Sequence, residues 1–236
     1  YRCPAHDYLT PSEAVGPADA PRCPKCGLEL VVRVDKVSKS KLNAPDSDVL
    51  IDRYGADAVR MFSLFGGPPV KDLEWSEAGI EGCSRFLQRI VRAVERWGTA
   101  RGASAGVADE APAALALRRK THRTIVRVTR DLGEEFQHNT AIAALMELVN
   151  ELYRDTDGRD VQALPAPLSA AVAEALDVLV RLLVPFAPHL AEEMNERLGS
   201  KQYLARRAWP EADPALLVDD EVELPVQVLG KLRGQI

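Results

Sequence analysis

The sequence predicts a mainly α-helical protein, in which a bundle of amphipathic helices follows a small cysteine-containing knuckle and β segment and precedes the start of a C-terminal β-strand. Between residues 76 and 199, apolar residues recur every three or four positions, as in helices that bury one face. Two short Cys/His pairs come before this region, and alternating apolar residues come after it, where a strand is expected.

The composition is that of a globular protein and not of a disordered chain or a disulfide scaffold. Of 236 residues, 46% are hydrophobic and 28% are charged. Charges interrupt every apolar stretch well short of the roughly 18 residues of a membrane span, and the first residues lack the apolar core of a signal peptide. We therefore expect a cytoplasmic protein with no membrane partner.

The net charge of −5 argues against a nucleic-acid partner, but the charge is unevenly distributed. Between Arg85 and Arg130, eleven basic residues stand against three acidic ones, so this segment carries +8 and the remainder carries −13. Because electrostatic fields act locally, a concentrated basic segment can form an anion-binding face on an acidic protein. An arginine-rich solvent face would give the same pattern.

The N-terminal segment contains the pairs Cys3-x-x-His6 and Cys23-x-x-Cys26. Two pairs with this spacing point four ligands at one ion, which predicts a structural Zn²⁺ site of the Cys3His type, and Gly27 suits the tight turn of the knuckle. Incidental thiols or a redox Cys-x-x-Cys are the alternatives, although a redox motif does not need the first pair. Because residues 1–30 contain little else to form a core, we expect the metal to fold them.

The elements that follow are predicted from local signals. Residues 28–34 alternate as in a strand and lead into a polar loop over 35–41. Asp46 is expected to cap a short helix that Gly55 ends, and a second helix is expected over 56–65.

Ser76 begins the clearest helix, which runs to Trp97. Its apolar residues share one face, and both Cys83 and Trp97 belong to that buried phase. The opposite face carries a row of four arginines suited to following a phosphate backbone: Arg85, Arg89, Arg92 and Arg96.

Further helices are expected over about 113–135, from an N-cap at Asn139, and over the apolar stretch before Pro185. Pro185 and Pro188 interrupt this last stretch, and a final short helix ends before Gly199. Four long amphipathic helices with modest loops predict a bundle.

The chain ends in alternating apolar residues, so a strand is expected over 221–229, with a hairpin beginning at Gly230 and Lys231.

The string from Lys36 to Lys41, followed by Asn43, resembles the KMSKS signature of class I aminoacyl-tRNA synthetases. Six further segments resemble the leucyl-tRNA synthetase family: Tyr54–Arg60, Gly66–Pro69, Lys71–Ser76, Phe136–Ile142, Pro185–Glu193 and Val226–Gly234. The resemblance covers residues 28–236 in order, with leucyl-type spacing. Val37 in place of Met and Leu42 in place of a common Gly depart from the family pattern.

The resemblance implies a class I synthetase-type anticodon-binding bundle and four regions. These are a zinc-knuckle insertion and strand (1–35), a KMSKS loop with stem-contact helices (36–75), the anticodon-binding bundle (76–199), and a linker with the start of a C-terminal domain (200–236). A HIGH-type motif is missing from the sequence. We therefore expect a part of a longer enzyme that is inactive by itself.

The implied activity of the parent protein is the ATP-dependent attachment of leucine to tRNA(Leu), with Mg²⁺ accompanying ATP, by a monomeric ligase. The resemblance implies that Lys36 and Lys39 are catalytic and that Ser38 and Ser40 help them to hold ATP. Candidate tRNA contacts are Arg85, Arg89, Arg92, Arg96, Lys231 and Arg233.

Other interpretations stay open at this point. The lysine-serine string could be a solvated linker. The whole chain could be a free-standing, non-catalytic tRNA- or RNA-binding module, or a zinc-containing interaction domain. The length of the natural reading frame would distinguish a free-standing RNA-binding module from a piece of a longer synthetase.

Overall fold

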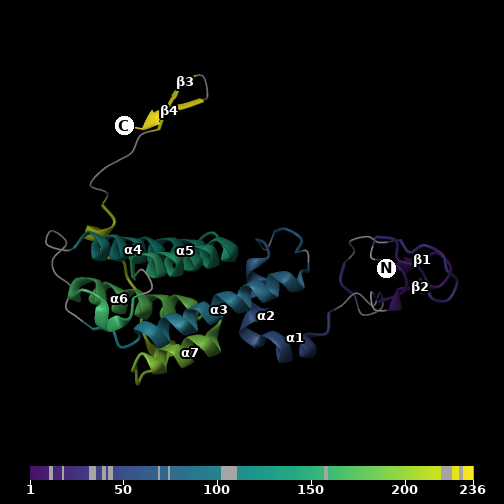
Figure 1. The fold of residues 1–236 in the computed structure, drawn as a ribbon, viewed down its shortest axis with the longest axis horizontal. Helices are drawn as coiled ribbons and strands as arrows, with labels where there is room; N and C mark the ends of the chain where they lie inside the picture. Colours follow the sequence, from purple (N-terminus) through teal and green to yellow (C-terminus); the bar gives the residue numbers. More distant parts are fainter. Residues whose placement is uncertain are drawn as a thin grey trace. The chain divides into compact units, whose positions relative to one another are not determined.

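The computed structural model describes residues 1–10, 13–17, 19–31, 36–38, 41, 45–68, 70–73, 75–101, 111–156, 159–218, 225–228 and 231–235. The chain forms two compact units, residues 1–56 and 57–236, and each is considered by itself. Figure 1 shows their elements along the chain.

The first unit is built on short extended segments. Strand β1 (Arg2–Cys3) pairs with β2 (Asp7–Tyr8) in antiparallel fashion. The strand expected over 28–34 is wrong in its described part, because Glu29 and Val31 form isolated bridges to Arg22 and Arg2. The backbone groups of this segment alternate between two different partners, so no regular ladder develops; residues 32–34 lie outside the described part.

The core of the first unit is small. Cys3, Leu9, Cys23 and Leu30 are its buried members, and Tyr1 and Ala14 pack against them. Two of the four buried side chains are thus thiols. A cluster of this size buries too little apolar surface to hold thirty residues together without a cross-link.

Helix α1 (Ser47–Tyr54) ends the first unit and confirms both predicted boundaries. An Asp46 carboxylate oxygen accepts a hydrogen bond from the Asp48 N–H at 3.0 Å. Gly55 has φ of +86°, a conformation that residues with a β-carbon avoid, and its N–H donates to the Ile51 carbonyl.

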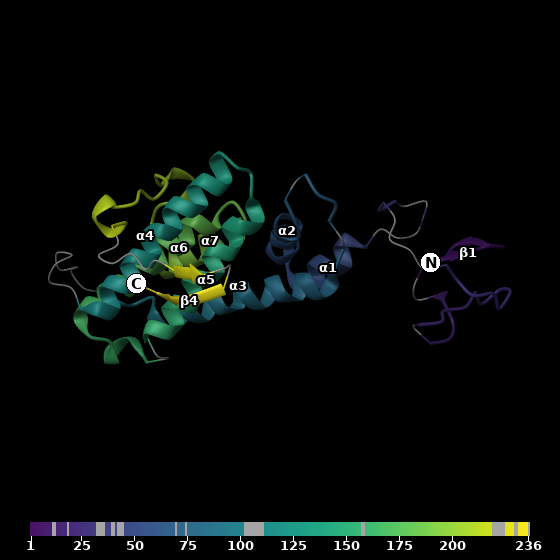
Figure 2. The same ribbon diagram turned by 90° about the horizontal axis from the view of Figure 1, so that it is seen from above.

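The second unit begins with α2 (Ala56–Phe65) and the long helix α3 (Glu77–Trp97). The Ser76 hydroxyl caps α3 by accepting from the Gly79 N–H at 3.2 Å, as predicted. At Gly79 a β-carbon would lie 2.5 Å from the Phe62 ring, so a glycine lets α2 approach α3 closely. Figure 2 shows α2 beside the N-terminal end of α3.

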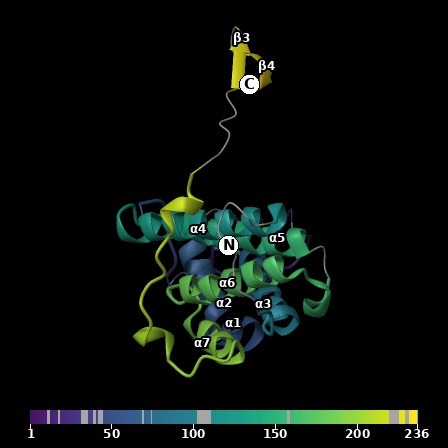
Figure 3. The same ribbon diagram turned by 90° about the vertical axis from the view of Figure 1, so that its left-hand side faces the viewer.

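The expected bundle is confirmed. It comprises α4 (Pro112–Gly133), α5 (His138–Thr156), α6 (Ala166–Leu183) and α7 (Pro188–Arg197) together with α3. Helix α4 packs on α5 and α6, α6 also packs on α7, and α3 packs on α5, α6 and α7. In Figure 3, α4 and α5 form one layer, α6 lies beneath it and α7 is lowest. Cys83 and Trp97 are buried, as predicted.

Two boundaries of the bundle helices differ from the sequence prediction. Asn139 is not an N-cap, because α5 already begins at His138 and the Gln137 carbonyl accepts from the N–H groups of Thr140 and Ala141. Helix α4 ends at Gly133, and the Gln137 N–H turns back to the Asp131 carbonyl at 2.8 Å. This local turn immediately precedes the start of α5.

Beyond α7 the chain continues through the 3₁₀ turns η5 (Leu204–Arg206) and η6 (Pro214–Leu216). Strands β3 (Pro225–Val228) and β4 (Lys231–Gln235) then form an antiparallel hairpin, as predicted, although its described strands are shorter than the expected segment. Among the described residues, every helix is too short or too polar to traverse a lipid bilayer.

Candidate metal centre and nucleic-acid interface

Cys3, His6, Cys23 and Cys26 come together in the first unit, and their ligand atoms all lie within 4.8 Å of one another. The Cys3 Sγ lies 3.6 Å from both the His6 Nδ1 and the Cys26 Sγ, and the Cys23 Sγ lies 3.7 Å from the His6 Nδ1. The cluster could hold a metal ion, as the spacing predicted.

These three distances fit a tetrahedral ion. With Zn–S bonds of about 2.3 Å and Zn–N bonds of about 2.0–2.1 Å, neighbouring ligand atoms are roughly 3.5–3.8 Å apart. The knuckle backbone has the required turn, because the Gly27 N–H donates to the Cys23 carbonyl at 2.8 Å and Gly27 has φ of +72°. The donor set of three thiols and one imidazole is a known structural-zinc set.

In the metal-free knuckle the thiolate form is favoured at Cys23 and not at Cys26: the Leu28 N–H lowers the pKa of Cys26, but burial and the hydrogen bonds with Cys3 and Cys23 together raise it above its ordinary value. Burial opposes ionisation of Cys23, but the N–H groups of Lys25 and Cys26 and the thiols of Cys26 and Cys3 donate to its sulfur and lower its pKa to about 6. All four cysteines of the chain, Cys83 included, are free of disulfides. Burial raises the pKa of Cys83 to about 11, which suits its place in the core.

The structure describes only part of the KMSKS-like loop. Lys36 is exposed and Ser38 is half-buried, and the Ser38 carbonyl accepts from the Lys41 N–H at 3.1 Å. Lys39 and Ser40 lie outside the described residues.

The four arginines of α3 have different surroundings. Arg89 donates to the Asn150 side chain at 2.9 Å and lies over the Tyr153 ring, while Arg96 pairs with Asp160 at 3.1 Å. Both therefore hold α3 against later parts of the bundle.

The other two arginines of this row face outward. Arg85 pairs with the exposed Glu81 one helical turn away. Arg92 is exposed and has no hydrogen bond or ion pair with any residue that the structure describes.

Acidic side chains of other helices form ion pairs with several basic side chains of α4. Glu147 of α5 lies 2.7 Å from the Lys120 Nζ and 3.4 Å from an Arg127 nitrogen. These contacts, the Lys120 hydrogen bond above all, hold the pKa of Glu147 below its ordinary value. Arg119, Lys120 and Arg123 also line an open cleft of about 410 Å³.

A buried polar network connects α4, α6 and the segment beyond α7. Glu174 accepts from the Arg118 Nε at 2.7 Å and from the His122 Nε2 at 2.9 Å. The His122 Nδ1 accepts from the Asp213 N–H at 2.8 Å, which assigns the imidazole proton to Nε2. Burial alone would raise the pKa of Glu174, but the hydrogen bonds from His122 and Arg118 hold it below its ordinary value.

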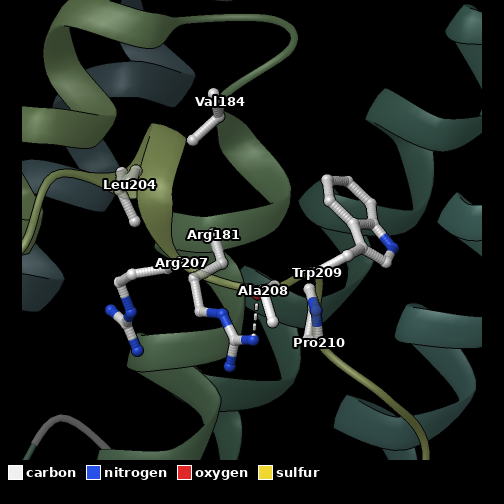
Figure 4. Close-up of a pocket in the computed structure, with 7 residues that line it drawn as sticks. All are labelled: Arg181, Val184, Leu204, Arg207, Ala208, Trp209 and Pro210. Atoms are coloured by element: carbon white, nitrogen blue, oxygen red, sulfur yellow. Dashed lines mark hydrogen bonds between the residues drawn. The ribbon is translucent and has the colours of Figure 1, made fainter.

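The segment beyond α7 is fastened to the bundle at further points, some of which Figure 4 shows around a cavity of about 60 Å³. Arg181 donates to the Ala208 carbonyl, and Arg207 donates to Asp177 at 2.7 Å. The Trp209 indole N–H donates to the Thr129 hydroxyl at 2.8 Å. The sequence did not indicate these contacts, because each partner lies far away in the chain.

Two segments that carry the sequence resemblance contact each other. Asp57 of α2 accepts from the Leu190 N–H at 2.7 Å and from the His189 Nδ1 at 2.9 Å at the start of α7. Arg60 donates twice to the Pro185 carbonyl, at 3.0 and 3.2 Å. Helix α2 is thereby clamped to the turn between α6 and α7.

Lys231 and Arg233 lie on β4 of the C-terminal hairpin, with Lys231 opposite Val228. The register shifts between Val226 and Gln227 of the paired strand.

The chain is similar to several known proteins. Residues 115–236 match the family described as the anticodon-binding domain of tRNA ligase. A leucine–tRNA ligase of Synechococcus sp. (strain CC9605) is 48% identical over 233 residues, which are 97% of this chain and 26% of the relative. A leucine–tRNA ligase of Synechococcus elongatus is 43% identical over 236 residues, which are 100% of this chain and 26% of the relative.

Among solved structures, the chain is similar to the Agrobacterium radiobacter K84 AgnB2 LeuRS in its ternary complex with tRNA and LeuAMS. The TM-score is 0.71 at 32% sequence identity, over 85% of this chain and 25% of that one. The chain thus spans about a quarter of the length of the relatives it matches. Because the family match covers more than half of the chain, the chain belongs to the tRNA ligases that carry this anticodon-binding domain, and its similarity over nearly its whole length is to leucine–tRNA ligases.

Proposed function

We propose that this chain is the part of a leucine–tRNA ligase that binds tRNA(Leu) and supplies the KMSKS loop for the ATP-dependent attachment of leucine. The observation that carries the proposal is the similarity over 97–100% of the chain to leucine–tRNA ligases. The helical bundle and its outward arginines support it. A free-standing RNA-binding module is less favoured, since these relatives contain the matching segment within a chain about four times as long.

Within this proposal, the four regions keep the bounds 1–35, 36–75, 76–199 and 200–236, and the parent enzyme acts as a cytoplasmic monomer. The activation of leucine by ATP, with Mg²⁺, places negative charge on departing pyrophosphate. Lys36 and Lys39 neutralise that charge, and Ser38 and Ser40 hold the loop against the nucleotide. Such contacts accelerate the reaction because they strengthen in the transition state.

The loop is tested in the complete enzyme that contains this chain. Lys39→Ala is expected to lower the rate of pyrophosphate exchange far more than the affinity for leucine. Lys41→Ala, in the same loop, is the matched control and should change both much less. Equal and small effects of Lys39→Ala on the two quantities would contradict a transition-state role.

For tRNA binding, Arg92 and Arg85 are the best candidates of the α3 row, because Arg89 and Arg96 are held by other parts of the bundle. Lys231 and Arg233 are further candidates on β4. Contacts of this kind fix the position of the RNA without reading its sequence. Since few arginines point freely outward, the isolated chain should bind tRNA weakly.

The interface is tested by the salt dependence of tRNA binding, measured by fluorescence anisotropy. Each lost phosphate contact reduces the slope of log affinity against log salt by about 0.7–0.9. Arg92→Ala should show this reduction. Arg197→Ala should not, because Arg197 is already paired with Glu95 and Glu193. Unchanged slopes for Arg92→Ala and Arg85→Ala would refute the assignment of this face.

The cluster of Cys3, His6, Cys23 and Cys26 is proposed to bind structural Zn²⁺. Zinc fits the distances, the donor set and the small core that it would cross-link. Elemental analysis of the purified chain should give one zinc per molecule. Cys23→Ser should lose the zinc, whereas Cys83→Ser should retain it because Cys83 lies in the helical core. Zinc-free wild-type protein with an unchanged spectrum after chelation would overturn this assignment.

The isolated chain is expected to aminoacylate nothing, because the sequence lacks a HIGH-type motif. Leucylation of tRNA by the 236-residue chain alone would contradict this account.

A further inference from the structure

The three thiols of the metal cluster differ in their access to solvent. Cys3 and Cys23 are each 1% exposed, whereas Cys26 lies at the surface. The small core therefore shields two of the sulfurs and leaves the third open to reagents in solution. Oxidation of a cysteine depends on its exposure as well as on its chemical form, so a soluble oxidant meets Cys26 first.

A second sulfur lies close to the exposed one. The Cys3 Sγ is 3.6 Å from the Cys26 Sγ, although the two residues are 23 positions apart in the chain. A disulfide bond has an S–S length of about 2.05 Å, so its formation needs the two sulfurs to approach by about 1.5 Å. Backbone groups hold both sulfurs in place, since the Ala5 N–H donates to Cys3 at 3.4 Å and the Leu28 N–H donates to Cys26.

Coordination of a metal supplies the reactive chemical form. A thiol that coordinates a metal ion is deprotonated outright, and the thiolate is the form that oxidants attack. Coordination thus overrides the raised pKa that Cys26 has in the metal-free knuckle. In the loaded cluster, the Cys26 sulfur is both a thiolate and accessible from solvent, whereas the sulfurs of Cys3 and Cys23 are thiolates without access.

We propose that Cys26 is a site of oxidation by hydrogen peroxide, and that Cys3 then closes a disulfide with it and releases the metal ion. The inference rests on the proposed zinc site. In the first step the Cys26 thiolate attacks the peroxide, an S–O bond forms, the O–O bond breaks and hydroxide leaves. In the second step the Cys3 thiolate attacks the sulfenic acid of Cys26, the S–S bond forms and a second hydroxide leaves. The two thiolates lose two electrons, the peroxide gains them, and two protons from solvent convert the hydroxides into water.

The reaction exchanges one cross-link of the N-terminal unit for another. It removes two of the four ligands, and His6 and Cys23 alone are too few for a structural zinc site. The disulfide joins the same two Cys/His pairs that the ion joins, so the small core keeps a cross-link after oxidation. Reduction by a soluble thiol restores both ligands, as in the transient redox-sensing disulfides of the cytosol.

The test adds hydrogen peroxide to the zinc-loaded 236-residue chain and measures the released zinc with a chromogenic chelator. One zinc per chain should be released, and dithiothreitol with added zinc should reverse the loss. Trypsin cleaves after arginine and lysine, which places the three cysteines in separate peptides, residues 3–22, 23–25 and 26–33. Digestion without a reductant should therefore give peptide 3–22 joined to peptide 26–33.

Two variants and one labelling experiment separate oxidation at Cys26 from general damage. Cys26→His keeps four zinc ligands but removes the exposed thiol, so it should retain its zinc in peroxide. Cys83→Ser is the matched control, because Cys83 is buried in the helical bundle, and it should release zinc like the wild type. A brief pulse of iodoacetamide on the zinc-loaded wild type should modify Cys26 before Cys3 or Cys23.

The possible results are distinguishable. If the purified wild type contains no zinc, the proposed metal site fails and the oxidation proposal fails with it. If zinc is present but peroxide does not release it, or if the disulfide joins Cys23 to Cys26, the oxidation proposal alone is overturned. Equal zinc release from Cys26→His and the wild type would also overturn it. If Cys26→His does not fold, the order of labelling and the peptide map of the wild type decide, and modification of a buried cysteine before Cys26 would refute the proposal.

Discussion

Replacement of Glu174 by Gln tests whether the buried polar network holds the segment beyond α7 on the bundle. The carboxylate serves Arg118 and His122 together, and these two side chains are only 11% and 8% exposed. A glutamine has one carbonyl oxygen and one NH₂ group, so one of the two donors loses its acceptor and the arginine loses its counter-charge.

The expected loss of stability follows from this burial. Removal of one partner of a fully buried ion pair costs about 3–5 kcal/mol. The Glu174 side chain is 31% exposed, so water relieves part of this penalty and we expect about 2–3 kcal/mol. The assay is urea unfolding followed by circular dichroism at pH 7. Glu193→Gln is the matched control, since Glu193 forms an exposed pair with Arg197 one turn away, worth about 0.3–0.5 kcal/mol.

The effect of Glu174→Gln should also depend on pH. The pKa of Glu174 is lower in the folded chain than its ordinary value of 4.5, so the folded state binds fewer protons at this group. Its contribution is therefore complete above pH 4.5 and is lost as the pH falls through the lowered folded value. The difference between wild type and variant should stay constant from pH 7 to about 5 and shrink below that. A loss no larger than that of Glu193→Gln, or one that grows on acidification, would refute the reasoning.

Two further substitutions test the attachment of α2. Gly79→Ala should destabilise the chain by about 1–3 kcal/mol, because its β-carbon would lie 2.5 Å from the Phe62 ring. Gly82→Ala in the same helix has open space around the new β-carbon and should stabilise the chain by up to about 1 kcal/mol. Equal effects of the two variants on urea unfolding would contradict the close packing of α2 on α3. Asp57→Ala should lower the free energy of unfolding by about 1–2 kcal/mol, because the Asp57 carboxylate caps α7 through the Leu190 N–H. Asp57→Asn keeps a hydrogen-bond acceptor and should lower it less. The reverse order of the two variants would exclude a capping role.

Features that depend on neighbouring residues could be predicted from the sequence. The caps at Asp46 and Ser76 use N–H groups two and three residues away, so the local pattern contains all of the information. The face that α3 buries follows from the helical period. The gathering of Cys3, His6, Cys23 and Cys26 was predictable because each pair places its two side chains three residues apart.

Features that depend on distant partners could not be predicted in this way. Asn139 is a residue type that often caps helices, but α5 begins one residue earlier, at His138, where the Gln137 N–H is bonded back to the Asp131 carbonyl. The row of arginines on α3 was predicted as one face, yet Asn150 holds Arg89 across 61 positions of the chain. Helical periodicity predicts which side chains face away from the helix's buried face. Only the folded structure shows whether a carboxylate or an amide of another element contacts them.

The contact between α2 and the turn before α7 joins two separate segments that both carry the resemblance to one family. Asp57 and Arg60 belong to the first segment, and their partners belong to the second, more than a hundred positions later. The carboxylate of Asp57 replaces a cap that Ala187, the residue preceding α7, does not supply. Segments that carry the sequence resemblance can thus have the structural role of connecting two helices.

The uneven charge distribution of the sequence also reflects contacts between distant segments. The +8 segment and its acidic remainder are largely partners in the folded chain, since Glu147, Glu174 and Asp160 each meet a cation of α3 or α4. Such pairs contribute little to the field that an approaching RNA experiences, because their charges cancel over a few ångströms. In the tRNA binding proposed above, the affinity therefore depends on outward cations such as Arg92. The proposed tRNA binding should accordingly show a shallow dependence on salt.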